Sequence, residues 1–167
     1  MQVELVVRKF VVMQIDTLTY LQTALSHMDD FIRRAVHYAQ SSGQFPTDAL
    51  RGLVITNEEV TQNLQNAPLN GFWSGDAQRP PLFDLDERAA GTDRLAHLTR
   101  IYDLNTLDLN IFLLCLAPQL DRRYERLYAY LQDDISLKTP TVNLMMNLLG
   151  VDADERLIIW GRLTADM

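Results

Sequence analysis

Apolar residues recur at steps of three and four along most of this chain, and that period is the strongest constraint on its fold. The longest such run extends from about Thr17 to Ser41. These steps place side chains on one face of an α-helix, so the run predicts a long amphipathic helix over residues 17–41. Asp16 or Thr17 can cap its start, and Gly43 is a natural stop. The expected apolar face comprises Leu18, Leu21, Leu25, Met28, Phe31 or Ile32, Ala35 or Val36, and Ala39.

Residues 92–163 continue this period and predict a densely helical core. The segment LDLNIFLLCLA is apolar nearly all round, as expected of a central helix. Thr139 and Pro140 form a start signal, a capping hydroxyl followed by proline at the first helical position, and Gly150 ends that helix. We therefore predict an all-α, compact multi-helix domain. The last expected helix, over residues 153–163, carries Leu157, Ile158, Trp160 and Leu163, and Asp152 with Glu155 resembles a capping box at its start.

The segments before this core are less regular. Residues 1–15 are rich in valine and fit either a strand or a helix. We treat them as a lead-in segment whose secondary structure the sequence does not determine. Thr56 with Glu59 three residues on matches a capping box. We expect a short helix to follow, with Val60 and Leu64 facing inward.

A long loop at residues 66–91 interrupts the single domain that we expect over residues 16–167. Phe72, Trp73 and Phe83 are large apolar residues in this otherwise irregular stretch. They either anchor the loop on the core or form a docking surface, since loops of this length are commonly functional or flexible. We treat the three as a candidate docking loop.

The composition excludes several classes of protein. The net charge of −7 opposes nonspecific binding to nucleic acid, which needs a basic face. No apolar run reaches the roughly 18 residues that a membrane span needs. The single cysteine, Cys115, is expected in the core and permits neither an intramolecular disulfide nor a cysteine-rich zinc site. These features fit a protein of the reducing cytoplasm with no membrane partner.

The sequence offers no catalytic centre. It has no Gly-Lys pair, which a phosphate-binding loop requires. Residues 71–75 resemble a hydrolase nucleophile elbow, but one position out of register. His27 and Asp30 could share a helix face, yet a metal site needs three or four ligands. The acidic pairs could act as acid and base, although beside helix ends and turns they are typical capping or solvated groups; they are Asp29 with Asp30, Asp84 with Asp86, and Asp133 with Asp134.

The stretch Tyr124–Leu149 is specific in sequence but chemically silent. It predicts two short helices joined by a polar turn, with tyrosines concentrated on the first. Tyr124, Tyr128 and Leu131 share one helical face. The rings either pack the edge of the core with their hydroxyls reaching solvent or a partner, or form an interface hot spot. The candidate interaction or structural motif comprises Tyr124, Glu125, Arg126, Tyr128, Tyr130, Asp133 and Asp134.

A longer pattern around this motif resembles a known family. The run LDLNIFLLCLAPQLDRRYERLYAYLQDDISLKTPTVNLMMNLLG is similar to the N-terminal helical region of AAA+ ATPases encoded with extracellular contractile injection systems, the phage-tail-like particles. The similarity extends over Leu18–Leu163, and its most specific part is Leu116–Leu144. Weaker support comes from the segment RGLVITNEEV at Arg51–Val60.

The resemblance implies a winged-helix-related module that precedes a nucleotide-hydrolysing motor. The motor would carry the phosphate loop, use ATP and Mg²⁺, and work as a ring, a hexamer. No catalytic residue of the family can be placed on this chain, and residues 1–15 have no counterpart in it. We therefore expect a non-catalytic adaptor domain without a cofactor of its own, either part of a longer ATPase or a stand-alone homologue. It would position partner proteins or subunits for a motor domain in cis.

Two alternative functions stay open. The helices at 107–117, 140–149 and 153–163 have the lengths of the helical part of a winged helix, here without its wing, and the last would be the recognition helix of a DNA-binding regulator. Its acidic residues outnumber Arg156 and Arg162, whereas base reading needs a basic face. The other alternative is a small helical enzyme with a site near residues 72–86, which a buried carboxylate with a perturbed pKa would support.

Overall fold

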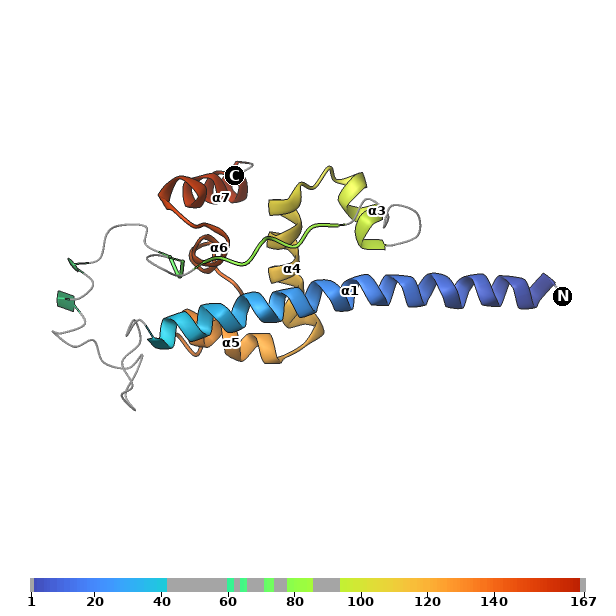
Figure 1. Cartoon of the computed structure of the whole chain (residues 1–167), viewed down its shortest axis with the longest axis horizontal. Helices are drawn as coiled ribbons and strands as arrows, with labels where there is room; N and C mark the ends of the chain where they lie inside the picture. Colours follow the sequence, from blue (N-terminus) through green and yellow to red (C-terminus); the bar gives the residue numbers. More distant parts are fainter. Residues whose placement is uncertain are drawn as a thin grey trace.

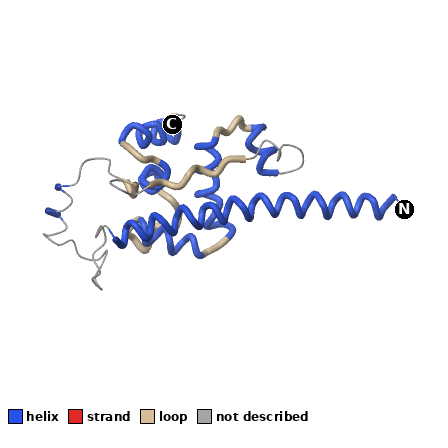
Figure 2. The backbone as a smooth tube through the Cα atoms, viewed as in Figure 1, coloured by secondary structure: helices blue, strands red, loops and turns tan. Residues whose placement is uncertain are grey.

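The computed structural model describes residues 2–41, 60–61, 64–65, 71–73, 78–85 and 94–165, with side chains described from Tyr20 onward in the first range. These ranges contain helices and connecting loops but no strand, so the predicted all-α fold is confirmed (Figure 2). The main helices are α1 (Gln2–Ser41), α3 (Arg94–Ile101), α4 (Thr106–Leu120), α5 (Arg123–Leu131), α6 (Val142–Leu149) and α7 (Ala153–Thr164).

Helix α1 is longer than its sequence predicted. It begins at Gln2 instead of Thr17, so the valine-rich lead-in continues the helix. The C-terminal half of α1 lies against the body of the other helices, while its N-terminal part extends beyond them (Figure 1). From Leu21 onward, where side chains are described, the predicted apolar stripe faces this body. Its fully buried members are Met28, Phe31, Ile32, Ala35 and Ala39.

Helix α4 is central, as its apolar sequence predicted, and contacts α1, α5 and α6. Asn105 caps it, and a reciprocal capping box with Asp108 satisfies backbone N–H groups in its first turn. Pro118 lies inside the helix, which continues to Leu120. Cys115 is exposed, so the prediction that it lies in the core is wrong. A helix that is apolar all round does not reveal which side its neighbours leave open.

Helices α6 and α7 follow each other closely and pack together (Figure 1). Thr141 caps α6 by accepting a hydrogen bond from the backbone N–H of Leu144, so the start predicted at Thr139 and Pro140 is two residues too early. Gly150 ends α6, as predicted. Asp152 caps α7 through the N–H of Glu155, also as predicted.

Residues 78–85 form an extended segment that passes from beside α6 across α4 toward α3 (Figure 1). Its main anchor is Asn110 on α4, whose side chain is fully buried. The Asn110 amide accepts from the backbone N–H of Phe83 at 3.0 Å and donates to the Phe83 carbonyl at 2.7 Å. One side chain therefore satisfies both backbone groups of a buried loop residue, which an extended segment cannot do within itself.

The short helix expected after residues 56–59 is described only in part. Those four residues lie outside the described ranges. Val60 and Leu64 are helical but exposed, so the prediction that they face inward is wrong.

Candidate protein-interaction site

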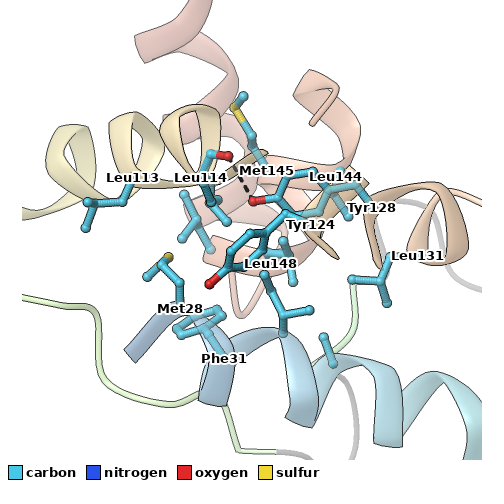
Figure 3. Close-up of a cluster of buried hydrophobic side chains, with 14 of the residues drawn as sticks. Met28, Phe31, Leu113, Leu114, Tyr124, Tyr128, Leu131, Leu144, Met145 and Leu148 are labelled. Atoms are coloured by element: carbon cyan, nitrogen blue, oxygen red, sulfur yellow. Dashed lines mark hydrogen bonds between the residues drawn. The ribbon is translucent and has the colours of Figure 1, made fainter. Parts of the chain in front are cut away.

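Tyr124 and Tyr128 are buried in the core between α5, α1 and α4 (Figure 3). The Tyr128 hydroxyl donates to the Leu114 carbonyl at 2.8 Å. Pro118, four residues after Leu114, has no N–H to donate to that carbonyl, so the tyrosine supplies the missing donor. The Tyr124 hydroxyl donates to Oδ1 of Asp29 on α1 at 2.6 Å. Burial raises the pKa of both hydroxyls, so both stay neutral at physiological pH and act as structural donors.

The outward half of the same motif lines an open groove of about 1080 Å³. Tyr124 and Tyr128 point into the core, whereas the other members of the motif gather around this groove. The groove opens broadly to solvent. The motif residues in its wall are Glu125, Arg126, Tyr130, Asp133 and Asp134.

A turn organised by Gln132 forms one wall of the groove. The Gln132 amide nitrogen donates to the carbonyls of Tyr128, Leu137 and Thr139 at 3.0–3.2 Å. Its amide oxygen accepts from the backbone N–H of Thr141 at 3.1 Å, which also fixes the cap of α6. One side chain therefore joins the end of α5, the turn and the start of α6.

The tip of this turn presents an apolar side chain. Asp133 has a φ of 52°, a left-handed conformation that reverses the chain. Asp134 accepts from the N–H and the hydroxyl of Ser136, and these hydrogen bonds hold the pKa of Asp134 below its usual value. Ile135, which lies between Asp134 and Ser136 in the sequence, is 88% exposed. Asp133 and Asp134 therefore shape the turn.

Most charges at the start of α5 are paired with one another. Arg123 binds Asp121 at 2.6 Å and reaches Asp29 at 3.4 Å. Hydrogen bonds from the Arg123 backbone and side chain hold the pKa of Asp121 below its usual value. Arg122 lies 3.5 Å from Glu125. The groove is therefore nearly neutral, and its side chains suit binding more than proton transfer or metal ligation.

Phe72, Trp73 and Phe83 are buried, which favours the interpretation that they anchor the loop over a docking role. The Trp73 indole donates to the Leu148 carbonyl at 2.6 Å, and its ring meets Phe31 edge-on at 5.5 Å. All three side chains belong to the hydrophobic core. Asp84 lies on the surface, and Asp86 is outside the described residues.

His27 has a structural contact in place of a metal ligand set. Its Nε2 lies 2.7 Å from the Pro81 carbonyl, and its ring packs on Phe31 and Phe83. Asp30, which could have shared its face, pairs with Arg33 at 2.6 Å. In the part of the chain that the structure describes, no three metal-ligating side chains converge. No helix there is both long enough and apolar enough to cross a bilayer.

Helices α6 and α7 form a helix-turn-helix, with Gly150 in the short turn between them. A Cβ atom at Gly150 would lie 2.5 Å from Cγ of Arg156 and 3.0 Å from the Met146 carbonyl. The turn therefore requires glycine because α7 lies so close. Arg156 is buried beneath this contact and donates to the Asn147 side chain, and burial lowers its pKa.

The exposed surface of α7 carries three large apolar side chains in addition to Asp154 and Arg162. Leu157, Ile158 and Trp160 are 54%, 63% and 51% exposed. The two arginines of this helix are both engaged within the chain. Arg156 points inward, and Arg162 makes a two-pronged ion pair with Asp108 on α4, at 2.7 and 2.6 Å. In a DNA-binding helix-turn-helix the second helix contacts the DNA, and α7 is the second helix here. We call the exposed surface of α7 that carries Leu157, Ile158 and Trp160 the α7 face.

Residues 15–159 match the family model described as a winged helix domain, variant, so the chain belongs to this winged helix domain family. The helical order and the helix-turn-helix agree with that assignment, including the winged-helix relation predicted for the C-terminal half. No curated protein and no solved structure matches the chain.

Sequence reasoning missed Asn110 and Gln132, two polar residues that organise the fold around the site. Neither has a motif. For Asn110 the available signal was a lone amide inside the most apolar run of the chain, because a polar residue on a central helix needs a buried partner. Gln132 lies in a polar turn, where nothing in the sequence distinguishes it.

Proposed function

We propose that this chain is a non-catalytic domain that binds other proteins, with the α7 face as its principal contact. The observation that carries the proposal is the chemistry of that face. A winged helix that reads DNA needs cations on its recognition helix to hold phosphates and bases. Here the same position presents Leu157, Ile158 and Trp160. Leu157 and Trp160 lie one turn apart on the helix, and exposed aliphatic and aromatic neighbours of this kind are typical of protein interfaces.

The charges support the same interpretation. Arg156 is buried and Arg162 is paired with Asp108, so neither extends freely toward a phosphate backbone. The net charge of −7 also repels DNA over the distance of a Debye length. A carboxylate, Asp154, lies at the start of the helix.

We further propose that the domain serves as an adaptor for an AAA+ ATPase of a contractile injection system. The support is the resemblance of Leu116–Leu144 to the N-terminal region of those ATPases, together with membership of a winged helix family. In that role the domain would position partner proteins or neighbouring subunits, and a motor domain in cis would hydrolyse ATP with Mg²⁺. The domain itself would need no cofactor, and it would work in the cytoplasm.

Titration of fluorescent duplex DNA with the purified chain tests the choice between protein and DNA. Binding that weakens steeply between about 50 and about 200 mM salt would mark phosphate contacts. We expect no such binding, because the α7 face has no available cation. Salt-dependent binding that Trp160→Ala abolishes would replace our proposal with the DNA-binding regulator.

The link to a motor needs its own test. We expect the chain, expressed with the adjoining coding sequence and neighbouring genes, to be joined to or to co-purify with a ring-forming ATPase. Calorimetry on the chain alone should detect no ATP binding. Measurable ATP affinity of the isolated chain, or the absence of any phosphate-loop protein encoded with it, would contradict the adaptor role.

A further inference from the structure

We propose that the groove beside α5 binds an acidic peptide segment of a partner protein, one that carries a large apolar residue among its carboxylates. This surface is additional to the α7 face. Figure 1 shows α5 and α7 at opposite edges of the helical body, so the two surfaces are separate. The inference rests on which side chains of the groove are already engaged and which are available.

The four carboxylates of the groove all have interactions within the chain. Arg122 lies 3.5 Å from the first, and Arg123 pairs with the second at 2.6 Å. Ser136 donates two hydrogen bonds to the third, and the residue of the fourth also has an interaction within the chain. In that order they belong to Glu125, Asp121, Asp134 and Asp133. The groove therefore offers few free acceptors to a ligand.

Two cations of the groove are available. Arg126 lies on α5 and Lys138 on the turn, and both are exposed. Among the described residues, neither side chain has a hydrogen-bond or ion-pair partner. Guanidinium and ammonium groups can only donate, and their strongest hydrogen bonds are with anions. The formal charges of the groove cancel, but the polar groups that it leaves for a ligand are donors, so the ligand must supply negatively charged acceptors.

The groove also offers an apolar contact. Ile135 on the turn is 88% exposed, and Ala129 and the ring of Tyr130 line the α5 wall. Covering Ile135 with an apolar side chain removes its surface from water, which favours binding. The hydrogen bonds of Gln132 hold the turn in place before a ligand arrives, and such preorganisation lowers the entropic cost of the contact.

The extent of the groove suits a short extended segment. It follows α5 from Asp121, just before the helix, to Lys138 on the turn beyond its end. A helix of nine residues is about 13 Å long, and an extended chain advances about 3.3 Å per residue. About four peptide residues therefore cover α5, and they can place carboxylates near both free cations with an apolar side chain between them.

The carboxylates in the wall distinguish a peptide from a nucleic acid. A single strand carries a negative charge at every nucleotide, so some of its phosphates would meet Asp133 and Asp134. A peptide can place its carboxylates only where the cations lie. The net charge of −7 also opposes a polyanion more strongly than a short peptide. The charge pattern therefore favours the acidic peptide.

Fluorescence anisotropy of a labelled peptide tests this inference. The probe has glutamates on both sides of a single leucine, and the purified chain is titrated into it. We expect binding in the range of about 10 to about 500 µM, because small contacts are weak, and binding should weaken as salt is added. A matched peptide with glutamines in place of the glutamates should bind at least about tenfold more weakly.

Variants of the free cations test the assigned residues. Arg126→Gln and Lys138→Gln should each weaken peptide binding about two- to fivefold, the range of an exposed ion pair. The fold should persist, because neither side chain has a partner to lose. Arg94→Gln on α3 is the matched control, since it removes the same charge from another exposed arginine, and it should change nothing. Ile135→Ser should also weaken binding of the peptide.

The contradicting results are equally specific. A peptide that fails to bind at about 1 mM chain, or equal effects of Arg126→Gln and Arg94→Gln, would overturn the inference. Single-stranded DNA that binds the groove more tightly than the peptide, and loses that binding in Arg126→Gln, would assign the groove to phosphates instead. Trp160→Ala should leave peptide binding unchanged, so the groove and the α7 face are judged separately. Loss of peptide binding in that variant would also contradict the inference.

Discussion

Individual side chains stabilise this fold by making hydrogen bonds to backbone groups that have no backbone partner. Tyr128 donates to a carbonyl that Pro118 cannot serve, and Asn110 satisfies both backbone groups of Phe83. The sequence predicted that Tyr124 and Tyr128 share a helical face, because spacing alone determines that. It left open whether the face is buried, because burial depends on α1, a partner about a hundred residues earlier in the chain.

The hydroxyl of Tyr128 should contribute measurably to stability. Tyr128→Phe leaves the buried Leu114 carbonyl without its donor, so we expect the free energy of unfolding to fall by about 1–3 kcal/mol. Urea denaturation followed by circular dichroism measures this. Tyr102→Phe is the control, because Tyr102 lies largely in solvent. Equal effects of the two variants would show that the buried hydrogen bond contributes nothing.

Gly150 should tolerate no side chain. Gly150→Ala places a methyl group 2.5 Å from Cγ of Arg156, so α7 must shift, at a cost of about 1–3 kcal/mol. Gly161→Ala is the matched substitution in open space, where alanine should stabilise the helix by about 0.5–1 kcal/mol. Thermal unfolding of dilute samples compares the two. An unchanged melting temperature for Gly150→Ala would contradict the close packing of α6 on α7.

At the scale of helices, local capping signals were predictable where they act alone. Asp152 caps α7 as the sequence predicted. The start of α6 was not predictable, since Thr139 and Thr141 are both capable caps. The hydrogen bond that the Thr141 N–H donates to the Gln132 amide oxygen favours the second. The helical state of residues 2–15 was likewise undetermined, because valines spaced by four fit a helix as well as a strand.

Asp108 joins two helices and should make stability depend on pH. Its hydrogen bonds to Arg162, assisted by the Asn105 N–H, hold its pKa below the usual 3.8. A carboxylate with a lowered folded-state pKa stabilises the fold above the unfolded-state pKa, and that contribution is lost as the pH falls through the folded-state value. We therefore expect Asp108→Asn to lower the free energy of unfolding at pH 7 by about 1–2 kcal/mol.

The difference between the wild type and Asp108→Asn should shrink as the pH is lowered from 5 toward and below 3.8, the usual value of an aspartate. Urea denaturation over this range measures it. Asp154→Asn, which changes a carboxylate on the solvent side of α7, is the control and should show a small difference throughout. A difference for Asp108→Asn that is constant over the whole range would contradict the assigned ion pair.

At the scale of the whole molecule, the sequence predicted the class but not the assembly. Helical period and capping indicated an all-α domain related to the winged helix, and the structure and the family agree. The inward position of Trp73 and the outward position of Trp160 could not be predicted, because both are large apolar residues whose burial depends on helices packing from elsewhere in the chain. That difference places the apolar surface on α7 and underlies the proposed protein-binding role.

Acrylamide quenching of tryptophan fluorescence tests this role most directly, because the chain has two tryptophans and only Trp160 is accessible. Trp73 is buried and supplies a constant background. We expect quenching to decrease when a co-purifying protein partner is added and to stay unchanged when duplex DNA is added at low salt. Quenching that is unchanged by the protein partner but decreases with DNA would contradict the central claim that the α7 face binds protein.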